Sequence, residues 1–269
     1  MTPEEHLKQG DIDSTLKLLQ DQVRKNPASA KHRIFLFQLL AVSGQWDRAM
    51  TQLNVVGDLD DGALAMVYMY REVLNCEVFR EQVFQGLREP VVFGKPPEWI
   101  GLLVQALKLT AERKDAESQT LRNKAFDAAA ESMGEINGQP FVWIADADLR
   151  LGPALEAIIE GRYFWVPFQQ IRSISIEPPE DLRDVVWLPA HFTWSNGGES
   201  YGLIPTRYPD SYGHEDPLLA LSRKTEWKQC SADMYLGLGQ RLLTTDAGDF
   251  PLMEVRTIKI NSLPDTEKG

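Results

Sequence analysis

Residues 140–209 read PFVWIADADLRLGPALEAIIEGRYFWVPFQQIRSISIEPPEDLRDVVWLPAHFTWSNGGESYGLIPTRYP, and they hold 11 of the 25 aromatic residues of the chain. Rings of this size supply much of the burial in a protein core. In residues 191–195 (HFTWS) apolar and polar side chains alternate, which is typical of a half-buried strand. The segment therefore predicts a β-rich core rather than a surface on which bases or sugars stack.

Further runs with strand character follow, each bounded by Pro, Gly, Asn or Asp. Asn196-Gly197 lies between Trp194 and Tyr201 and predicts a hairpin with a type I′ turn, whose two central residues both have positive φ. Asp146 and Asp148 are expected to cap a short helix that ends before Gly161. The predicted strands are residues 162–166, 171–176, 185–195, 199–204, 224–228, 240–245 and 252–260. We expect Trp143, Trp165, Phe192 and Trp194 in the core.

The composition is that of a folded chain, with 43% hydrophobic and 25% charged residues. Its longest apolar run, residues 34–42, is far shorter than the ~20 residues that cross a bilayer. The N-terminal MTPEEHLKQGD has acids where a signal peptide has bases, which predicts a cytoplasmic protein. Cys76 and Cys230 have no CxxC companion, and we expect both to be inert.

The charge of the chain is unevenly distributed. Residues 1–134 carry 16 Lys and Arg against 19 Asp and Glu, whereas the rest carry 12 against 20, and the net charge is −11. An acidic surface repels phosphate, so nucleic acid is not an expected partner. A basic protein partner is compatible with this charge.

The first third contains an internal repeat. Gly10-Asp11 and Gly44-Gln45 lie 34 positions apart, which is the period of tetratricopeptide helix pairs. The small residues Thr15 and Ala49 match across the repeat, as do Leu19 and Leu53. A small residue lets paired helices approach, and a large residue four positions on fills the space between them. The alternative is an unrelated helical bundle.

Helical periodicity continues over residues 62–86, 97–111 and 114–130 and stops near Gly134. We therefore predict an α+β protein with two domains. Residues 1–134 form a tetratricopeptide-like α-helical domain, and residues 135–269 form a mixed, mainly antiparallel, aromatic-rich β domain with a short helix.

No motif for catalysis is assembled in this sequence. His191 and Ser195 share a face of a predicted strand, but no GxSxG turn exposes a nucleophile. Gly237-Leu238-Gly239 lacks the third glycine of a dinucleotide site, and Gly94-Lys95 lacks the glycine that a phosphate-binding loop requires. HExxH and zinc-type Cys/His spacings are absent as well. We expect no catalytic residue, no metal and no cofactor.

Several motifs together resemble the ImpE family, also called TagJ. The resemblance covers almost the whole chain. Its motifs are WIADAD at 143–148, RLGP at 150–153, GRY at 161–163, WVPF at 165–168, EPPEDLRD at 177–184, WLPA at 187–190, LIPTRY at 203–208 and TDAG at 245–248, with FLFQLL at 35–40 and GQWDRA at 44–49 in the helical half.

This resemblance implies a non-enzymatic adaptor, an accessory component of the bacterial type VI secretion system. Its implied partners are the N-terminal helix of the small contractile-sheath subunit and the AAA+ ATPase that disassembles contracted sheath. The alternative is a small-ligand-binding protein or enzyme with a site around Asp146, His191 and Arg207 in the aromatic domain.

The repeat register also predicts where a partner helix would bind. The first helix of each tetratricopeptide pair lines the concave surface. The inward positions are then Lys31, Ile34 and Gln38, and a shift of 34 positions gives Ala65, Tyr68 and Glu72. Ile34 and Tyr68 would form an apolar centre with polar edges, as a helix-binding groove requires. The alternatives are that Ile34 and Tyr68 are inter-helix core, or that the partner binds the acidic loop at 177–184.

Overall fold

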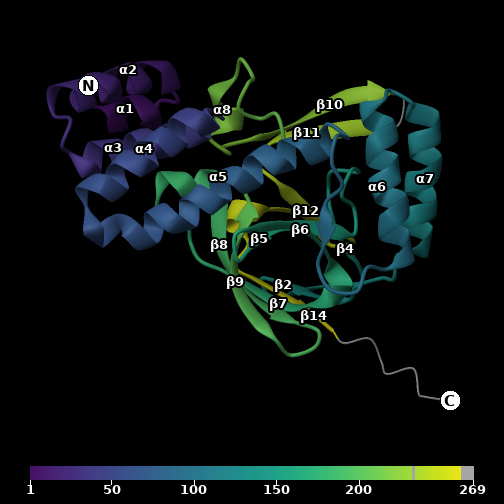
Figure 1. Ribbon diagram of the computed structural model, residues 1–269. Helices are drawn as coiled ribbons and strands as arrows, with labels where there is room; N and C mark the ends of the chain where they lie inside the picture. Colours follow the sequence, from purple (N-terminus) through teal and green to yellow (C-terminus); the bar gives the residue numbers. More distant parts are fainter. Residues whose placement is uncertain (232–233, 262–269) are drawn as a thin grey trace.

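The computed structural model describes residues 1–231 and 234–261. Its first half is helical, and Figure 1 shows α5 running from the N-terminal helices to α6 and α7, above the strands. Among the described residues, no helix is long and apolar enough to cross a membrane. The helices of this half are α1 (Pro3–Lys8), α2 (Ile12–Lys25), α3 (Ala30–Val42), α4 (Trp46–Leu59), α5 (Leu64–Phe84), α6 (Glu98–Ala111) and α7 (Asp115–Ala128).

The predicted repeat register agrees with the arrangement of these helices. Gly10 and Gly44 have φ of +83° and +66° and make the turns between α1 and α2 and between α3 and α4. The left-handed conformation suits glycine, which ends helices in this way. The small and large residues that repeat after these turns, Thr15, Leu19, Ala49 and Leu53, are all fully buried.

The second half consists mainly of strands in one large and two small sheets. The large sheet has nine strands in the order β1-β6-β5-β9-β8-β7-β14-β2-β3, with only the β1–β6 pair parallel. Its strands are β1 (Val91–Val92), β2 (Gly134–Ile136), β3 (Gln139–Phe141), β5 (Ala154–Ile159), β6 (Arg162–Pro167), β7 (Ile171–Ile176), β8 (Trp187–Trp194), β9 (Glu199–Pro205) and β14 (Thr257–Ile260). A second, two-stranded sheet pairs β10 (Thr225–Ser231) with β11 (Met234–Gly239). The third holds β4 (Ile144–Asp146), β12 (Leu242–Thr245) and β13 (Gly248–Pro251). The mainly antiparallel β half confirms the predicted fold class, and its short helix, α8 (Pro217–Ala220), lies elsewhere in the chain than the predicted one.

The predicted aromatic hairpin is formed by β8 and β9, but its turn is not type I′. Of Asn196 and Gly197, only Gly197 has positive φ, at +85°. The Gly197 N–H donates to the Trp194 carbonyl, and the Trp194 N–H donates to the Gly198 carbonyl. This pattern fits a three-residue loop in which a left-handed glycine follows a type I turn. The loop between the strands therefore has three residues, one more than the two-residue loop of a type I′ turn.

The helix predicted after Asp146 and Asp148 is wrong. Residues 154–159 form strand β5, which is buried on both faces and pairs with β6 along its whole length. A short apolar run of this kind has no periodicity that separates a buried strand from a buried helix. Gly152 has φ of +50°, and a Cβ there would lie 2.3 Å from the Phe126 ring, so the turn before β5 packs tightly on α7.

Helix gives way to strand between Ala128 and Gly134, near the predicted domain boundary. The main hydrophobic cluster nevertheless extends from Leu19 to Leu221 and takes side chains from both halves. A second cluster lies within the β half. Trp165, Phe192 and Trp194 are buried as predicted, whereas Trp143 is 38% exposed and is not a core residue.

Two arginines of the β half bind the helical half through backbone carbonyls. Arg207 donates to the carbonyls of Ala41 and Val42, at the C-terminal end of α3. Arg223 donates to the carbonyls of Leu7 and Lys8, at the end of α1. The last carbonyls of a helix have no partner within it, and positive charge there suits the helix dipole. The β half therefore caps the first helix of each repeat.

Candidate partner-binding site

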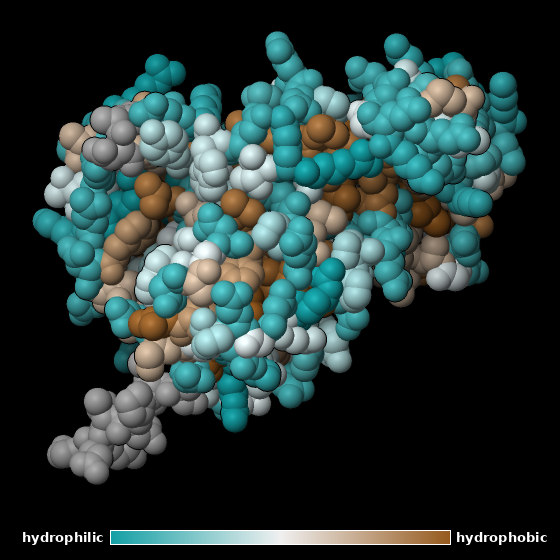
Figure 2. All heavy atoms as spheres, turned by 180° about the vertical axis from the view of Figure 1, so that it is seen from behind, coloured by the Kyte–Doolittle hydropathy of each residue, from teal (hydrophilic) through white to brown (hydrophobic). Residues whose placement is uncertain are grey.

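A hollow of about 570 Å³ lies between α5 and the large sheet, and we call it the α5 groove. Apolar side chains dominate its interior: Met69 and Val73 come from α5, and Ile158, Ala190 and Leu203 come from the sheet. Figure 2 shows the molecule from behind, where hydrophobic residues gather in hollows at the junction of helices and strands. The remaining lining residues are Glu72, Glu160, Gly161, Glu177, Pro189, His191, Tyr201 and Gly202.

The sheet side of the α5 groove presents an exposed aromatic pair. Tyr201 on β9 is 80% exposed, and its ring centroid lies 4.6 Å from that of His191 on β8. His191 Nε2 lies 3.4 Å from a carboxylate oxygen of Glu199. The cross-strand register pairs His191 with Tyr201 and so holds the two rings together. A large exposed tyrosine beside an apolar hollow is typical of a protein-binding surface.

Carboxylates surround the groove. Glu72 comes from α5, Glu160 from the turn between β5 and β6, and Glu177 from the segment after β7, and all three are exposed. Within the described parts of the chain, none of the three has an ion-pair partner, and neither Lys nor Arg lines the hollow. The groove is therefore apolar inside and negative at its rim.

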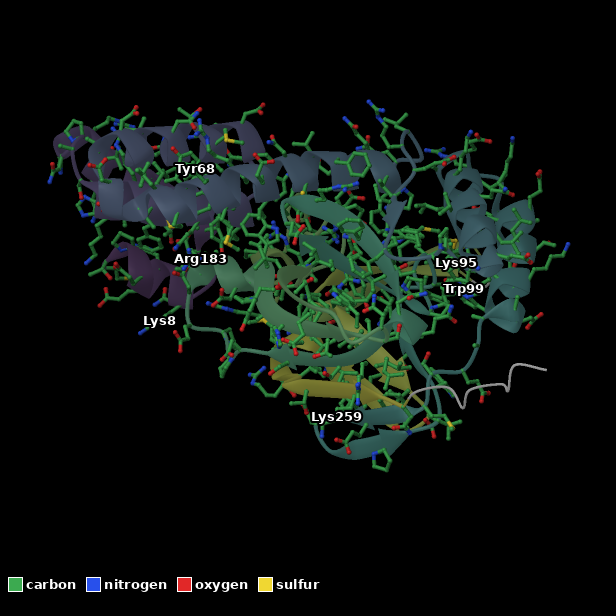
Figure 3. The ribbon with its side chains drawn as sticks, turned by 60° about the horizontal axis from the view of Figure 1, so that its bottom comes forward. Lys8, Tyr68, Lys95, Trp99, Arg183 and Lys259 are labelled. Atoms are coloured by element: carbon green, nitrogen blue, oxygen red, sulfur yellow. The ribbon has the colours of Figure 1, made fainter. Side chains whose placement is uncertain are left out.

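The structure places the predicted partner-binding residues in two groups. Tyr68 is 60% exposed and lies one turn before Glu72 on α5; Glu72 lines the α5 groove, whereas Tyr68 lies beside it and does not line it. Figure 3 shows Tyr68 on the helical layer. Lys31 is exposed at the start of α3, Ile34 is half-buried against the main core, and Gln38 is only 7% exposed. Ala65 is exposed near the start of α5.

The short helix η3 (Leu182–Val185) of the predicted acidic loop packs on α3. The Arg183 guanidinium lies 5.0 Å from the centroid of Tyr70, and Tyr70 in turn packs on Phe37 of α3. Figure 3 shows Arg183 at the junction of the helices and the β half. Asp184 is buried and accepts the backbone N–H groups of Glu180 and Asp181, so this end of the loop is built into the fold.

A network of buried charges links α5 to the sheet. Arg80 donates to both carboxylate oxygens of Glu156, over 2.5 and 2.9 Å. Arg241 also binds Glu156 with one arm of its guanidinium and binds Asp146 with the other. The Tyr163 hydroxyl donates to Glu156 over 2.5 Å. Each of these side chains is almost completely buried.

The pKa values of this network follow from burial and pairing. Burial raises the pKa of Glu156, but Arg80 and Arg241 outweigh it and hold the pKa at about 2. Asp146 differs because burial outweighs its pairing with Arg241, and its pKa rises to about 6. Perturbed carboxyls can mark catalytic sites. Here both carboxyls are satisfied by arginines inside the protein, which indicates a structural role.

The other candidates for chemistry are also engaged in the fold. Asp148 binds Arg150 and accepts the Gly237 backbone N–H, so Asp146 and Asp148 are partners of arginines rather than helix caps. Asp146, His191 and Arg207 have separate partners, and no hydrogen bond recorded for the described residues joins any two of them.

Possible metal ligands do not cluster in the described residues, and the two cysteines differ in exposure. No group of three or more His, Cys, Asp or Glu side chains among them could hold a metal ion. Cys76 is buried, and burial raises its pKa to about 12, which keeps the thiol protonated. Cys230 is exposed and not part of the core.

Of the residues predicted from the sequence to bind a partner, Glu72 lines the groove and Tyr68 lies next to it on α5, but nothing in the sequence indicated the sheet side of the groove. Ile158, Tyr201 and Leu203 lie 74 to 119 positions after the end of α5, and no local pattern brings such distant segments together. Tyr201 alternates with buried residues along a predicted strand, so the outward direction of its side chain was readable. The sequence did not show that α5 lies across the groove from this strand.

Comparisons with known proteins give a family, a close relative in sequence and a similar solved structure. The model of the ImpE protein family matches residues 138–259. The type VI secretion system accessory component TagJ of Pseudomonas aeruginosa is 51% identical over 258 residues, which cover 96% of this chain and 90% of that protein. The crystal structure of protein VPA1032 from Vibrio parahaemolyticus has a TM-score of 0.90 at 26% identity and covers 98% of this chain and 99% of its own. With half of its residues identical to TagJ over nearly its whole length, the chain belongs to the ImpE family.

Proposed function

We propose that this protein is a non-enzymatic adaptor of a bacterial type VI secretion system. It acts in the cytoplasm by binding the N-terminal helix of the small contractile-sheath subunit and assists the handling of that subunit by the AAA+ disassembly ATPase. The 51% identical relative is named as an accessory component of this system, which supports an accessory role. The buried, internally paired carboxyls support a role without catalysis.

The observation that carries the proposal is the exposed side of α5. Tyr68 and Met69 are large apolar residues with 60% and 46% of their surface exposed, and Glu72 and the α5 groove lie beside them. An amphipathic helix recognises a partner by laying its apolar face into such a groove. Exposed apolar patches on a folded chain commonly mark these interfaces.

On α3, Lys31 and Ile34 are proposed as a secondary contact. Lys31 is free to reach a partner at the start of that helix, and Ile34 is half-buried. Gln38 is buried and is proposed to act by supporting α3 from within.

The direct test is co-elution on a sizing column. Full-length small sheath subunit should shift this protein to an earlier volume, and the same subunit without its N-terminal helix should not. Tyr68→Ala should weaken the complex because it removes an exposed ring at the interface while leaving the core intact. If the shortened subunit co-elutes as well as the full-length one, the proposed helix is not the binding element.

A small-ligand-binding protein remains the second candidate because a hollow of about 570 Å³ lies within the ~300–1,000 Å³ range of small-molecule pockets. Native mass spectrometry of the purified protein separates the two functions. A small molecule retained through purification, and lost when Ala190→Trp fills the groove, would favour the second candidate.

A further inference from the structure

We infer that the α5 groove selects a cationic amphipathic helix, with the apolar stripe of that helix in the hollow and its Lys or Arg side chains against Glu72, Glu160 and Glu177. This inference rests on the proposed adaptor function and adds the chemistry of the partner. It is carried by the shape, the charge and the rigidity of the groove.

The shape of the hollow suits a helix laid along α5. Met69 and Val73 are four residues apart on α5 and stand on successive turns of one face. Helices pack by fitting side chains with this spacing between those of the partner. Ala190 and Leu203 oppose α5 from β8 and β9, so apolar side chains entering from a partner helix would meet apolar surface on both sides.

The charge at the rim selects a basic partner. The three glutamates come from three separate segments and have no ion-pair partner within the described residues, and the chain carries a net charge of −11. A neutral or acidic helix would cover these carboxylates without neutralising their negative charge, whereas the Lys and Arg side chains of a basic helix would form ion pairs with them. Complementary charge of this kind speeds association and excludes wrong partners.

Tyr201 adds an anchor on the sheet side. Its ring is 80% exposed and packs on His191. Tyrosines beside an apolar pocket often carry much of the binding energy of an interface. The open face of this ring also suits a Lys or Arg of the partner, because aromatic rings attract cations.

The walls of the groove are fixed before a partner arrives. Gly161 has φ of +71°, and a Cβ there would lie 3.0 Å from the Glu72 Cβ, so the turn between β5 and β6 packs directly on α5. The Cys76 thiol donates to the Gly161 carbonyl over 3.2 Å. Gly202 lies as close on the sheet side, where a Cβ would approach the Ile158 carbonyl oxygen to 2.7 Å. A preformed groove saves the cost of ordering its walls on binding.

The test uses two synthetic helices of equal length with the same leucine stripe, one flanked by lysines and one by glutamates, together with the small sheath subunit. Binding to the full-length protein is measured by fluorescence anisotropy at low and high salt. The lysine-flanked helix should bind, more weakly at high salt because screening shortens the reach of the glutamates. The glutamate-flanked helix should not bind.

The variant for this test is Glu72→Lys with Glu177→Lys, and its matched control is Glu89→Lys with Asp127→Lys. All four side chains are exposed, and the two control residues do not line the groove. Both variants change the net charge equally, so non-specific attraction to an acidic protein affects them alike. We expect the groove variant to lose roughly tenfold or more in affinity for the lysine-flanked helix and for the sheath subunit, and the control to bind like the parent.

Four outcomes separate this inference from the proposed function. Equal binding by the groove variant and its control overturns the inference, as does failure of the lysine-flanked helix to bind the parent. If the groove variant binds the sheath subunit as well as the parent does, the adaptor function stands but its binding site lies elsewhere on the protein. If the parent protein binds the lysine-flanked helix in the groove but does not bind the sheath subunit, the inferred chemistry of the groove stands and the proposed partner is wrong.

Discussion

Arg80 of α5 and Glu156 of β5 are 76 positions apart and form a two-armed ion pair in the interior of the protein. The same carboxylate accepts from Arg241 and Tyr163, so one side chain joins a helix to three parts of the β half. A second contact nearby has the same effect, because the Trp187 ring N–H donates to Glu77 of α5 over 2.8 Å. The helix that forms one wall of the α5 groove is thus held to the sheet that forms the other.

Glu156→Gln should destabilise the protein strongly. It leaves Arg80 and Arg241 buried without half of their counter-charge, and removing one partner of a buried pair costs about 3–5 kcal/mol. Chemical denaturation measures the loss. The matched control is Asp21→Asn, which breaks an exposed pair with Arg24 and should cost less than about 1 kcal/mol. Similar losses in the two variants would mean that the buried network contributes little.

The pH dependence of stability should have two opposing parts. The pKa of Glu156 is lowered to about 2, so its contribution is complete above its ordinary value near 4.5 and is lost as the pH falls towards 2. The pKa of Asp146 is raised to about 6, so the folded state holds an extra proton and stability falls as the pH rises from about 4 to 6.

The second part of this profile can be isolated. Asp146→Asn carries no titrating proton and should remove the decline in stability between pH 4 and 6, relative to the parent. Denaturation midpoints measured across this range are the readout. A decline that persists unchanged in the variant would assign it to another group.

Gly197→Val should cost roughly 1 kcal/mol or more because Gly197 has φ of +85°, a conformation that β-branched residues resist. Gly213→Val is the matched control, since Gly213 is also exposed, has no atom near its Cβ position and lacks a positive φ. Thermal unfolding compares the two. Equal stability would show that the hairpin turn relaxes at no cost.

Ile34→Ser and Tyr68→Ala should have different effects when made separately. Ile34 packs against the main core, so its substitution should lower stability by about 1 kcal/mol or more. Tyr68 is mostly exposed, so Tyr68→Ala should leave the unfolding midpoint almost unchanged and reduce binding of the sheath subunit instead. A Tyr68 variant that is unstable would place this ring in the core interactions of α5.

Local patterns predicted much of this fold, and distant contacts account for the rest. The turns at Gly10 and Gly44 were predictable because a repeat copies both the left-handed glycine and the small residue that follows it. Strand β5 was not, because ALEAII is buried on both faces and shows neither helical nor strand periodicity. Trp143 was assigned to the core from its size alone, and nothing in the neighbouring sequence indicated that the connection between β3 and β4, where it lies, faces solvent.

The candidate site was likewise predictable in part from local sequence patterns and depends in part on distant contacts. Tyr68 and Glu72 follow from the repeat register on one helix. The wall that opposes them depends on Gly161, which permits the turn between β5 and β6 to approach α5, and on Gly202, which permits β9 to approach β5, and that packing is a property of the whole fold.

Arg207 and Arg223 end helices that precede them by more than 160 residues. During synthesis on the ribosome, α1 and α3 therefore emerge long before the side chains that satisfy their last carbonyls. The repeats would remain loosely ordered and accessible to chaperones or proteases until the strands had been translated. A chain that terminated before Arg207 would lack both arginines. We expect such a fragment to be degraded rather than to persist as a helical fragment that competes for the partner.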